Sequence, residues 1–297
     1  MDKLELLTGR SEKDLLAIIT DIEKYYISYK VRKTDKKKFR WIDAPTSELK
    51  LIQRNLIRNF FSKVAIHSSA HGFVENKSSV TNAEQHLGNN ILLSVDIEDF
   101  FPSITMGNIL RAIIAAMNAS RIFLSKRELR ILTRLVSFKK HLPQGAPTSP
   151  IISNILFRSI DFKFASVFSK DNIVYTRYAD DITLSHKNTT YNFLNSVNLI
   201  ETVLRTLGLK LNRRKTKVIK QNRRMLVTGV VINNKLGTPR YYWRNLRAEL
   251  HNLYKNNVEI NKQKWSELNG KISWIYSLNP TRGKELQNSL SKIQLIN

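Results

Sequence analysis

The stretch YTRYADDITLS, residues 175–185, places two aspartates between two runs rich in aromatic and β-branched residues. Such runs favour β-strands, and the short polar step between them favours a tight hairpin turn. Asp180 and Asp181 then stand side by side at the tip of the hairpin, where their like charges repel. Because Arg177 is the only basic residue beside them in the turn, we expect a divalent cation to supply the compensating charge.

A third carboxylate is expected from the strand ILLSVDI, residues 91–97. Strand alternation puts Asp96 on the same face as Leu92 and Ser94, in an otherwise apolar setting. An isolated buried carboxylate would be costly there, so ligation is the favoured interpretation. Oxygen ligands of this kind select Mg²⁺, and two ions roughly 4 Å apart would support in-line nucleotidyl transfer. Glu98 and Asp99 are expected to be surface charges.

The composition indicates a polyanionic partner. The 297 residues contain 49 Lys and Arg against 24 Asp and Glu, which gives a formal net charge of +25. Residues 205–297 and the segment 30–40 are especially basic, and they flank the acidic stretches, as a nucleic-acid enzyme requires. The absence of cysteine excludes disulfides and thiolate zinc sites. We find no transmembrane run or signal peptide and expect a cytoplasmic protein without membrane contact.

Hydrophobic periodicity and breaker residues predict the elements. We expect helices over 11–28, 47–66 with Ser47 as N-cap, 190–207, and three more within 239–296, broken near Asn257 and at Asn279-Pro280. A further helix would open at Ser149 and Pro150, with a core-facing stripe of Ile152, Ile155, Leu156, Ile160, Phe164 and Val167. Strands are expected in a hairpin between 28 and 45, at 91–97, in the hairpin 173–185, and at 216–220 and 226–233.

The first of the three C-terminal helices carries two stripes. Its basic residues recur at helical spacing, at Arg240, Arg244, Arg247 and His251. The neighbouring apolar stripe consists of Trp243, Leu246, Leu250 and Leu253. We interpret the basic stripe as a track for a phosphate backbone, with a surface helix of extended arginines as the alternative.

Four motifs together resemble those of reverse transcriptases. DIEDFF (96–101), LPQGAPTSP (142–150), YADD (178–181) and GLKLNRRKTKV (208–218) are similar to the family's A, B, C and D motifs, in that order. NAEQH (82–86) and VTG (227–229) resemble two signatures of retron reverse transcriptases. The likeness, from about residue 28 to 233, implies an α+β right-hand polymerase. Its expected parts are fingers over 1–90, a palm with an antiparallel sheet over 91–235 and a three-helix thumb over 236–297.

The resemblance also implies roles for individual residues. Asp96, Asp180 and Asp181 would be catalytic metal ligands, aided by the backbone carbonyl of Ile97, with two Mg²⁺ as cofactors. Lys215 would protonate the leaving pyrophosphate, with a pKa lowered toward neutral, or be merely one of many basic residues. Phe101 would be the steric gate that favours deoxynucleotides, unless it belongs to the core with Phe100.

Other residues are implied in binding. Lys33 and Arg40 would hold the triphosphate, with Lys36, Lys37 and Lys38 as rivals of Lys33, and Gln144 would pack beside the nucleotide. Gly145 would let the template backbone approach closely. Nucleic-acid contact is expected at Asn82, His86, Val227, Thr228, Gly229, Arg240, Arg244 and Arg247. For the residues of the NAEQH and VTG motifs, a structural role is the alternative.

As a retron enzyme, the protein would reverse transcribe its cognate structured noncoding RNA with deoxynucleoside triphosphates. Synthesis would begin from the 2′-hydroxyl of an internal guanosine and leave a branched RNA–DNA product, multicopy single-stranded DNA. An effector protein in antiphage defence is the implied partner. Alternatives are a group II-like or abortive-infection reverse transcriptase, an RNA-dependent RNA polymerase, which Phe101 disfavours, and a scaffold whose RNA–DNA complex sequesters an effector.

Overall fold

The computed structural model describes residues 3–32 and 39–296, which divide into two compact units. The first unit is built from three stretches of the chain, Met1–Asn76, Leu93–Thr183 and Asn192–Lys217. The second unit is likewise discontinuous and comprises Lys77–Leu92, Leu184–Tyr191 and Val218–Asn297. No helix among the described residues combines the length and the apolar character that crossing a membrane requires.

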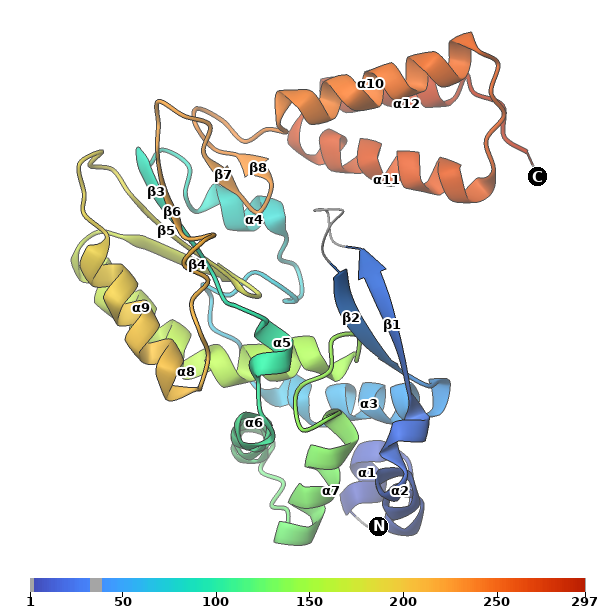
Figure 1. Ribbon diagram of the computed structural model, residues 1–297, viewed down its shortest axis with the longest axis vertical. Helices are drawn as coiled ribbons and strands as arrows, with labels where there is room; N and C mark the ends of the chain where they lie inside the picture. Colours follow the sequence, from blue (N-terminus) through green and yellow to red (C-terminus); the bar gives the residue numbers. More distant parts are fainter. Residues whose placement is uncertain (1–2, 33–38, 297) are drawn as a thin grey trace. The chain divides into compact units, whose positions relative to one another are not determined.

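The first unit is mainly helical. Its α-helices are α1 (Lys3–Thr8), α2 (Glu12–Thr20), α3 (Ser47–Asn59), α5 (Phe100–Ser103), α6 (Met106–Ser120), α7 (Lys126–Val136), α8 (Thr148–Lys170) and α9 (Leu194–Thr206), with 3-10 turns η1 (Ile22–Tyr25) and η2 (Phe61–Lys63). Helix α1 packs on α3, α2 on α7, and α6 on α8 (Figure 1). A capping box between Ser125 and Glu128 starts α7, because each side chain satisfies a backbone N–H of the first turn.

A two-stranded hairpin rises from this helical base. Strands β1 (Tyr26–Arg32) and β2 (Phe39–Pro45) pair antiparallel with Tyr26 opposite Pro45, which confirms the predicted hairpin. The hairpin is anchored at its base, where the buried ring of Tyr26 stacks on Phe138 with 4.3 Å between centroids. Towards Arg32 and Phe39, the last described residues of the two strands, the side chains are exposed.

A four-stranded sheet carries the acidic motifs. Its order is β4-β5-β3-β6, with bounds β3 (Ile91–Asp96), β4 (Val174–Tyr178), β5 (Asp181–His186) and β6 (Lys217–Lys220). Leu92 and Leu93 are both buried although they lie on opposite faces of β3. The strand is therefore covered on both faces, and Ser94, on the face of Leu92 and Asp96, is half-buried.

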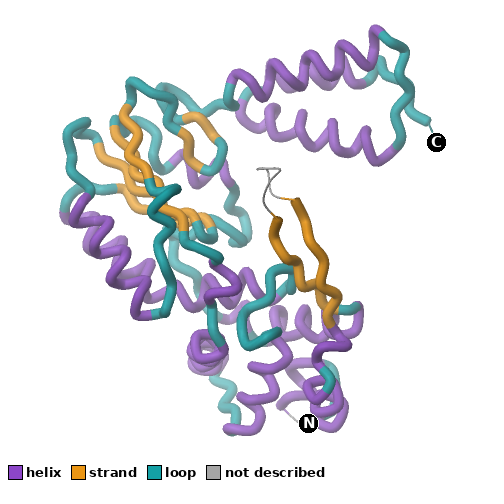
Figure 2. Tube along the Cα trace, viewed as in Figure 1, coloured by secondary structure: helices purple, strands orange, loops and turns teal. Residues whose placement is uncertain are grey.

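The second unit contains a small helix, a short hairpin and a helical bundle. These are α4 (Ser79–Glu84), β7 (Leu226–Val227), β8 (Val230–Val231), α10 (Arg240–Lys255), α11 (Lys262–Leu278) and α12 (Pro280–Leu290). Helix α11 packs on α12, and α10 packs on both, in the helical region next to the C-terminus in Figure 2. Their shared core includes Leu246, Leu250 and Ile272. The predicted break at Asn279-Pro280 is confirmed, because the Asn279 side chain caps α12 and Pro280 begins it.

Several expected boundaries are wrong. The first long helix ends at Thr20, and residues 22–25 form a 3-10 turn that leads into β1. Thr46, not Ser47, is the N-cap position of α3, and that helix ends at Asn59. Helix α9 begins only at Leu194.

The long helix of the B motif also differs from expectation. Helix α8 begins at Thr148 after Pro147, ahead of the predicted Ser149 cap. Pro150 is tolerated in the first turn because the N–H groups there have no helical acceptor. Of the predicted core stripe, Val167 is exposed, whereas Phe164 is fully buried.

Candidate active site

The two aspartates of the YADD stretch lie at a tight hairpin turn. Strand β4 ends at Tyr178 and β5 begins at Asp181, and Ala179 between them has a left-handed φ of 56°. The backbone N–H of Ile97 donates to the carbonyl of Asp180 over 3.2 Å. The expected adjacency of the Asp96 strand end and the turn is therefore confirmed, although a long stretch of sequence separates them.

The negative charges near this turn shift the pKa values of its carboxyl groups. Burial is the main cause that raises the pKa of Asp181 to about 6, and the charges of Asp180 and Asp96 raise it further. Burial also raises the pKa of Asp180, while the cations of Lys215 and Arg40 oppose that change. The carboxylates are therefore near enough for their negative charges to influence one another, and such an environment favours a cation.

The D-motif lysine lies directly against the first aspartate. Lys215 Nζ donates to Asp96 Oδ1 over 2.8 Å, and Asn212 Nδ2 donates to Asp96 Oδ2 over 3.2 Å. The hydrogen bond to Asp96 raises the pKa of Lys215, and the neighbouring carboxylates add to the shift. This direction is opposite to the lowered pKa expected of a general acid. In this structure Lys215 pairs with Asp96, and its role as proton donor stays a prediction.

The expected gate residue lies at the surface of an aromatic cluster. Phe100 is buried, whereas Phe101 is half-buried, and their ring centroids are 5.2 Å apart. A residue not singled out from the sequence, Phe73, places its exposed ring 6.3 Å from that of Phe101. Of the two phenylalanines in the A motif, Phe101 is therefore the one available to a nucleotide.

The LPQG segment is bound to the β1–β2 hairpin. The Gln144 carbonyl accepts a hydrogen bond from the Asp43 N–H over 2.8 Å. Gly145 has a φ of 129°, and a Cβ there would lie 2.9 Å from Ile42 Cγ2 and 3.0 Å from the Asp43 carbonyl. Strand β2 thus approaches Gly145 closely, and the approach of a template backbone at this glycine stays a prediction. Lys33, with its rivals Lys36, Lys37 and Lys38, lies outside the described residues.

Comparison with known proteins identifies the family. Residues 31–232 match the family model of the reverse transcriptases, the RNA-dependent DNA polymerases. The chain is 30% identical over 281 residues to the Retron Ec86 reverse transcriptase of Escherichia coli, a match that covers 94% of this chain and 84% of that enzyme. The chain belongs to the retron reverse transcriptases. Its membership makes it an RNA-directed DNA polymerase, of a family that generally uses divalent metal ions.

Further comparisons agree with this family. The chain is 32% identical to the Retron Mx65 reverse transcriptase of Myxococcus xanthus over 89% of its own length and 64% of that enzyme. A telomerase of Candida tropicalis, solved in complex with a TWJ fragment of telomeric RNA, aligns with a TM-score of 0.51 at 12% identity, over 94% of this chain and 57% of that one. At that identity the likeness shows the reverse transcriptase fold, an α+β right-hand polymerase.

The carboxylates of this retron reverse transcriptase fit a divalent cation by their chemistry. They offer hard oxygen donors, and the Asp96 carboxylate already attracts the ammonium group of Lys215. In the described parts of the chain, no three acidic or histidine side chains are grouped as a ready coordination sphere. Asp96, Asp180 and Asp181, with the carbonyl of Ile97, are the groups that would hold the metal.

The two retron signatures lie within the second unit and bond to protein. Asn82 Nδ2 donates to Thr228 Oγ1 over 3.4 Å, and Thr228 Oγ1 donates to the Ser79 carbonyl over 3.1 Å. His86 Nδ1 lies 2.7 Å from Ser185 Oγ, with both side chains fully buried. The bonds of Thr228 join helix α4 to the Val-Thr-Gly turn. The contact of His86, which follows α4 in the chain, joins this segment to strand β5.

Burial therefore corrects part of the binding prediction. The side chains of Asn82, His86 and Val227 are buried in the apolar cluster around α4, β7 and β8 or beside it, so they have no surface to offer to nucleic acid. Thr228 and Gly229 have positive φ values of 46° and 85° and form a tight turn. Burial favours the structural alternative for Asn82, His86 and Val227. Nucleic-acid contact by Thr228, which is half-buried, and Gly229, which is exposed, stays a prediction.

The predicted basic stripe on α10 is exposed. Arg240, Arg244 and Arg247 lie on the solvent side, whereas Leu246 and Leu250 face the bundle core. Trp243 lies between these faces, with the guanidinium carbons of Arg247 and Arg282 each 4.8 Å from its ring centroid. The stripe is thus a cationic surface on a rigid helix, as a phosphate track requires.

Sequence reasoning missed the side chains that support the acidic turn. Arg177 and Asp161 are both fully buried and form an ion pair of 2.7 Å. The signal was present, because Asp161 follows Ile160 on the face of α8 that was expected to be apolar. A charged residue among core positions indicates a buried partner, and Arg177 is the one charged residue of strand β4.

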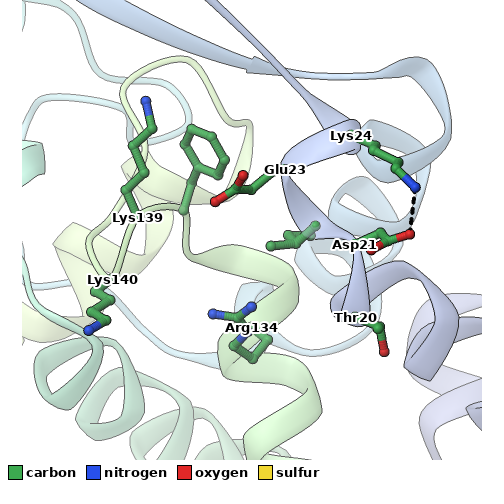
Figure 3. Close-up of a pocket in the computed structure, with 9 residues that line it drawn as sticks. Thr20, Asp21, Glu23, Lys24, Arg134, Lys139 and Lys140 are labelled. Carbon is green, nitrogen blue, oxygen red and sulfur yellow. Dashed lines mark hydrogen bonds and ion pairs between the residues drawn. The ribbon is translucent and has the colours of Figure 1, made fainter.

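A separate pocket of about 360 Å³ lies at the end of α2 (Figure 3). Its charged lining mixes acidic Asp21 and Glu23 with basic Arg134, Lys139 and Lys140. None of the predicted site residues lines this pocket, so it is distinct from the catalytic carboxylates.

Proposed function

We propose that this retron reverse transcriptase copies its own structured noncoding RNA, starting from the 2′-hydroxyl of an internal guanosine and leaving a branched RNA–DNA product. The observation that carries the proposal is the conjunction of two features in one chain. The three carboxylates of a polymerase gather at the Asp180 turn, and both retron signatures interlock around α4.

In the proposed mechanism, Asp96, Asp180 and Asp181 hold two Mg²⁺ ions. When bound, such ions activate the attacking hydroxyl and stabilise the leaving pyrophosphate. Lys215 balances the charge of Asp96, to which it already donates. Arg40, whose charge opposes the rise in the pKa of Asp180, would hold the triphosphate of the incoming deoxynucleotide.

The remaining parts of the site select and position the substrates. The half-buried ring of Phe101, supported by Phe100 and Phe73, would press against the sugar and exclude a 2′-hydroxyl. The backbone of Gln144 is bonded to β2, and its side chain would pack beside the nucleotide. The arginines of α10 would follow the phosphate backbone of the RNA. In this scheme residues 1–90 act as fingers, 91–235 as palm and 236–297 as thumb.

The test is to purify the protein from cells that carry its native locus and to sequence the nucleic acid bound to it. We expect one RNA species joined to DNA through a 2′,5′ branch, so that debranching enzyme separates the two strands. The Asp180→Asn, Asp181→Asn variant should retain the RNA and lack the DNA. Glu98→Gln, an exposed carboxylate two residues from Asp96, is the matched control and should make normal product.

Heterogeneous RNA, or DNA without a branch, would instead indicate a group II-like or abortive-infection enzyme. A role in antiphage defence with an effector protein is part of the same proposal. It predicts that the carboxylate variant abolishes protection in a phage plating assay while Glu98→Gln keeps it. Protection that survives the loss of DNA synthesis would favour the scaffold role.

A further inference from the structure

A fully buried ion pair lies behind the catalytic turn. Arg177 makes two parallel hydrogen bonds to Asp161, from Nε to Oδ1 over 2.9 Å and from Nη2 to Oδ2 over 2.7 Å. Tyr175 donates its hydroxyl to the same carboxylate over 2.6 Å. Both charged side chains have no exposed surface, and Arg177 lies only three residues before Asp180.

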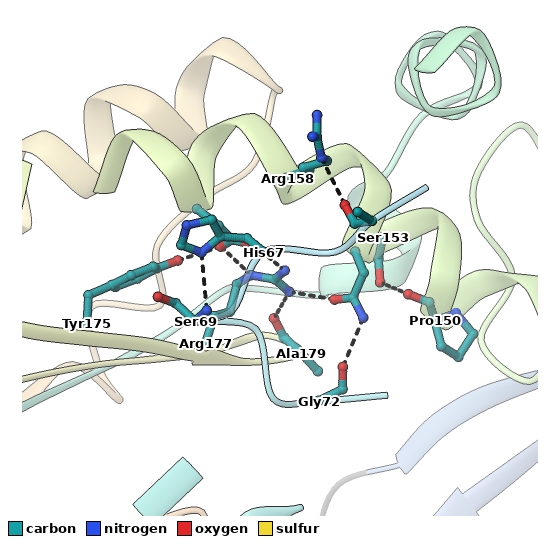
Figure 4. Close-up of polar contacts among 12 residues, drawn as sticks. His67, Ser69, Gly72, Pro150, Ser153, Arg158, Tyr175, Arg177 and Ala179 are labelled. Atoms are coloured by element: carbon teal, nitrogen blue, oxygen red, sulfur yellow. Dashed lines mark hydrogen bonds and ion pairs between the residues drawn. The ribbon is translucent and has the colours of Figure 1, made fainter. Parts of the chain in front are cut away.

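The remaining guanidinium nitrogen reaches the turn itself. Arg177 Nη1 donates to the carbonyl of Ala179 over 3.2 Å and to Asn154 Oδ1 over 3.1 Å (Figure 4). Ala179 is the residue with left-handed φ that directly precedes Asp180. A non-glycine residue persists in that region only when its surroundings hold it there, and the Arg177 bond is one such constraint.

A second constraint comes from the segment 69–72, which we call the strap. The Arg177 N–H donates to the Ser69 carbonyl over 2.9 Å, and the His71 N–H donates to the Arg177 carbonyl over 2.8 Å. Asn154 Nδ2 donates to the Gly72 carbonyl over 2.9 Å. Asn154 therefore ties the strap and the guanidinium together from helix α8.

The strap also touches the turn directly. A Cβ on Gly72 would lie 2.5 Å from the Ala179 nitrogen and 3.0 Å from the Tyr178 carbonyl carbon. The backbone of the turn is thus enclosed between the strap and the guanidinium. An ion pair used only for stability could be replaced by apolar side chains, whereas the donor to the Ala179 carbonyl could not.

We propose that Arg177, held by Asp161 and Asn154, is a positioning residue that fixes the Asp180–Asp181 turn for metal binding. The proposal rests on the metal role given to these carboxylates above. It does not depend on the branched product, because it is tested with an RNA template annealed to a DNA primer.

The first test removes the charges without leaving one of them unpaired. The triple variant Tyr175→Phe, Arg177→Met, Asp161→Leu fills the site with apolar groups of similar size, which generally preserves folding. We expect a cooperative thermal transition, a kcat lowered about 10- to 100-fold by the misplaced turn, and a nearly unchanged KM for the deoxynucleotide. Mn²⁺ binding to the nucleic-acid-free protein, followed by electron paramagnetic resonance, should weaken at least severalfold.

The second test leaves the ion pair intact. Asn154→Ala removes the link between Arg177 and the strap, and Asn108→Ala is its matched control. Asn108 is also a buried asparagine of the first unit, and its Nδ2 donates to the Leu207 carbonyl over 2.8 Å. Both variants should lose similar stability, whereas only Asn154→Ala should weaken Mn²⁺ binding and speed hydrogen exchange at residues 179–181.

A merely structural ion pair would give different results in both tests. A folded triple variant with the parent kcat and Mn²⁺ affinity would overturn the proposal. So would equal losses of Mn²⁺ affinity in Asn154→Ala and Asn108→Ala. If the triple variant does not fold, the asparagine pair decides alone. Normal Mn²⁺ binding by all variants would refute the positioning role alone. Unbranched DNA from the parent protein would refute the proposed retron reaction alone.

Discussion

Gly72→Ala should disable catalysis without touching any charged group. The added Cβ would meet the Ala179 nitrogen at 2.5 Å, whereas ordinary contact begins near 3.4 Å, so the two backbones must separate by about 0.9 Å. The strap is fixed at Ser69, His71 and Gly72 by three hydrogen bonds. We therefore expect the turn, which ends at the catalytic carboxylates, to take much of the displacement.

The magnitude follows from this geometry. A misplacement of about 1 Å in a catalytic group can lower the rate about 100-fold, which corresponds to about 2.7 kcal/mol in the activation free energy. Overpacking at a buried contact costs about 1–3 kcal/mol of folding free energy, so the variant should still fold. The rate should be measured by single-turnover primer extension and the stability by thermal denaturation.

Gly107→Ala is the matched control for this experiment. Gly107 lies in the first turn of α6, and a Cβ there would meet only Thr105 Oγ1, at 3.8 Å. It should keep the parent rate and stability. A folded Gly72→Ala protein with the parent rate would refute the reasoning, because it would mean that the strap yields and the turn does not depend on it.

Three further variants test other parts of the molecule. Phe101→Ala should raise incorporation of ribonucleotides relative to deoxynucleotides by about 10- to 100-fold. Phe73→Ala should raise it less, because the Phe73 ring only supports the gate. Competition primer extension measures both effects. His86→Ala should lower the free energy of unfolding by about 2–4 kcal/mol, because it leaves a cavity and an unpaired Ser185 hydroxyl. Urea denaturation measures this loss, and an unchanged stability would contradict the buried hydrogen bond. Arg244→Gln should weaken RNA binding and reduce the salt dependence, the slope of log K against log salt, by about 1; an unchanged slope would remove Arg244 from the phosphate track.

Much of the catalytic arrangement could be predicted because local rules act on it directly. Alternation along β3 places Asp96 at the end of an apolar strand, and turn chemistry places Asp180 and Asp181 at a hairpin tip. The stripes of α10 follow from helical spacing alone. In each case the informative residues lie within one strand, turn or helix, so their spacing in the sequence is enough to predict which side of that element they occupy.

The residues that escaped prediction depend on partners in other elements. Arg177 is explained by Asp161 and Asn154 on α8, and no local rule says which carboxylate a buried arginine will find. Gly145 was singled out from the sequence, but its contact with strand β2, which lies far away along the chain, was not predicted. Helix ends were misplaced for a different reason, since Thr46 and Ser47 are both good cap residues and tertiary packing chooses between them.

The retron signatures illustrate how a short motif can serve a site that it never touches. His86 is paired with Ser185 on β5, and β5 begins at Asp181, so the histidine fixes the strand that carries a catalytic carboxylate. Thr228 is paired with α4, the helix that ends just before His86. A buried polar group left without its partner costs about 1–3 kcal/mol, so each signature needs the other to stay satisfied. We infer that the two signatures hold one frame around β5, and we expect RNA to be read by exposed groups such as the arginines of α10.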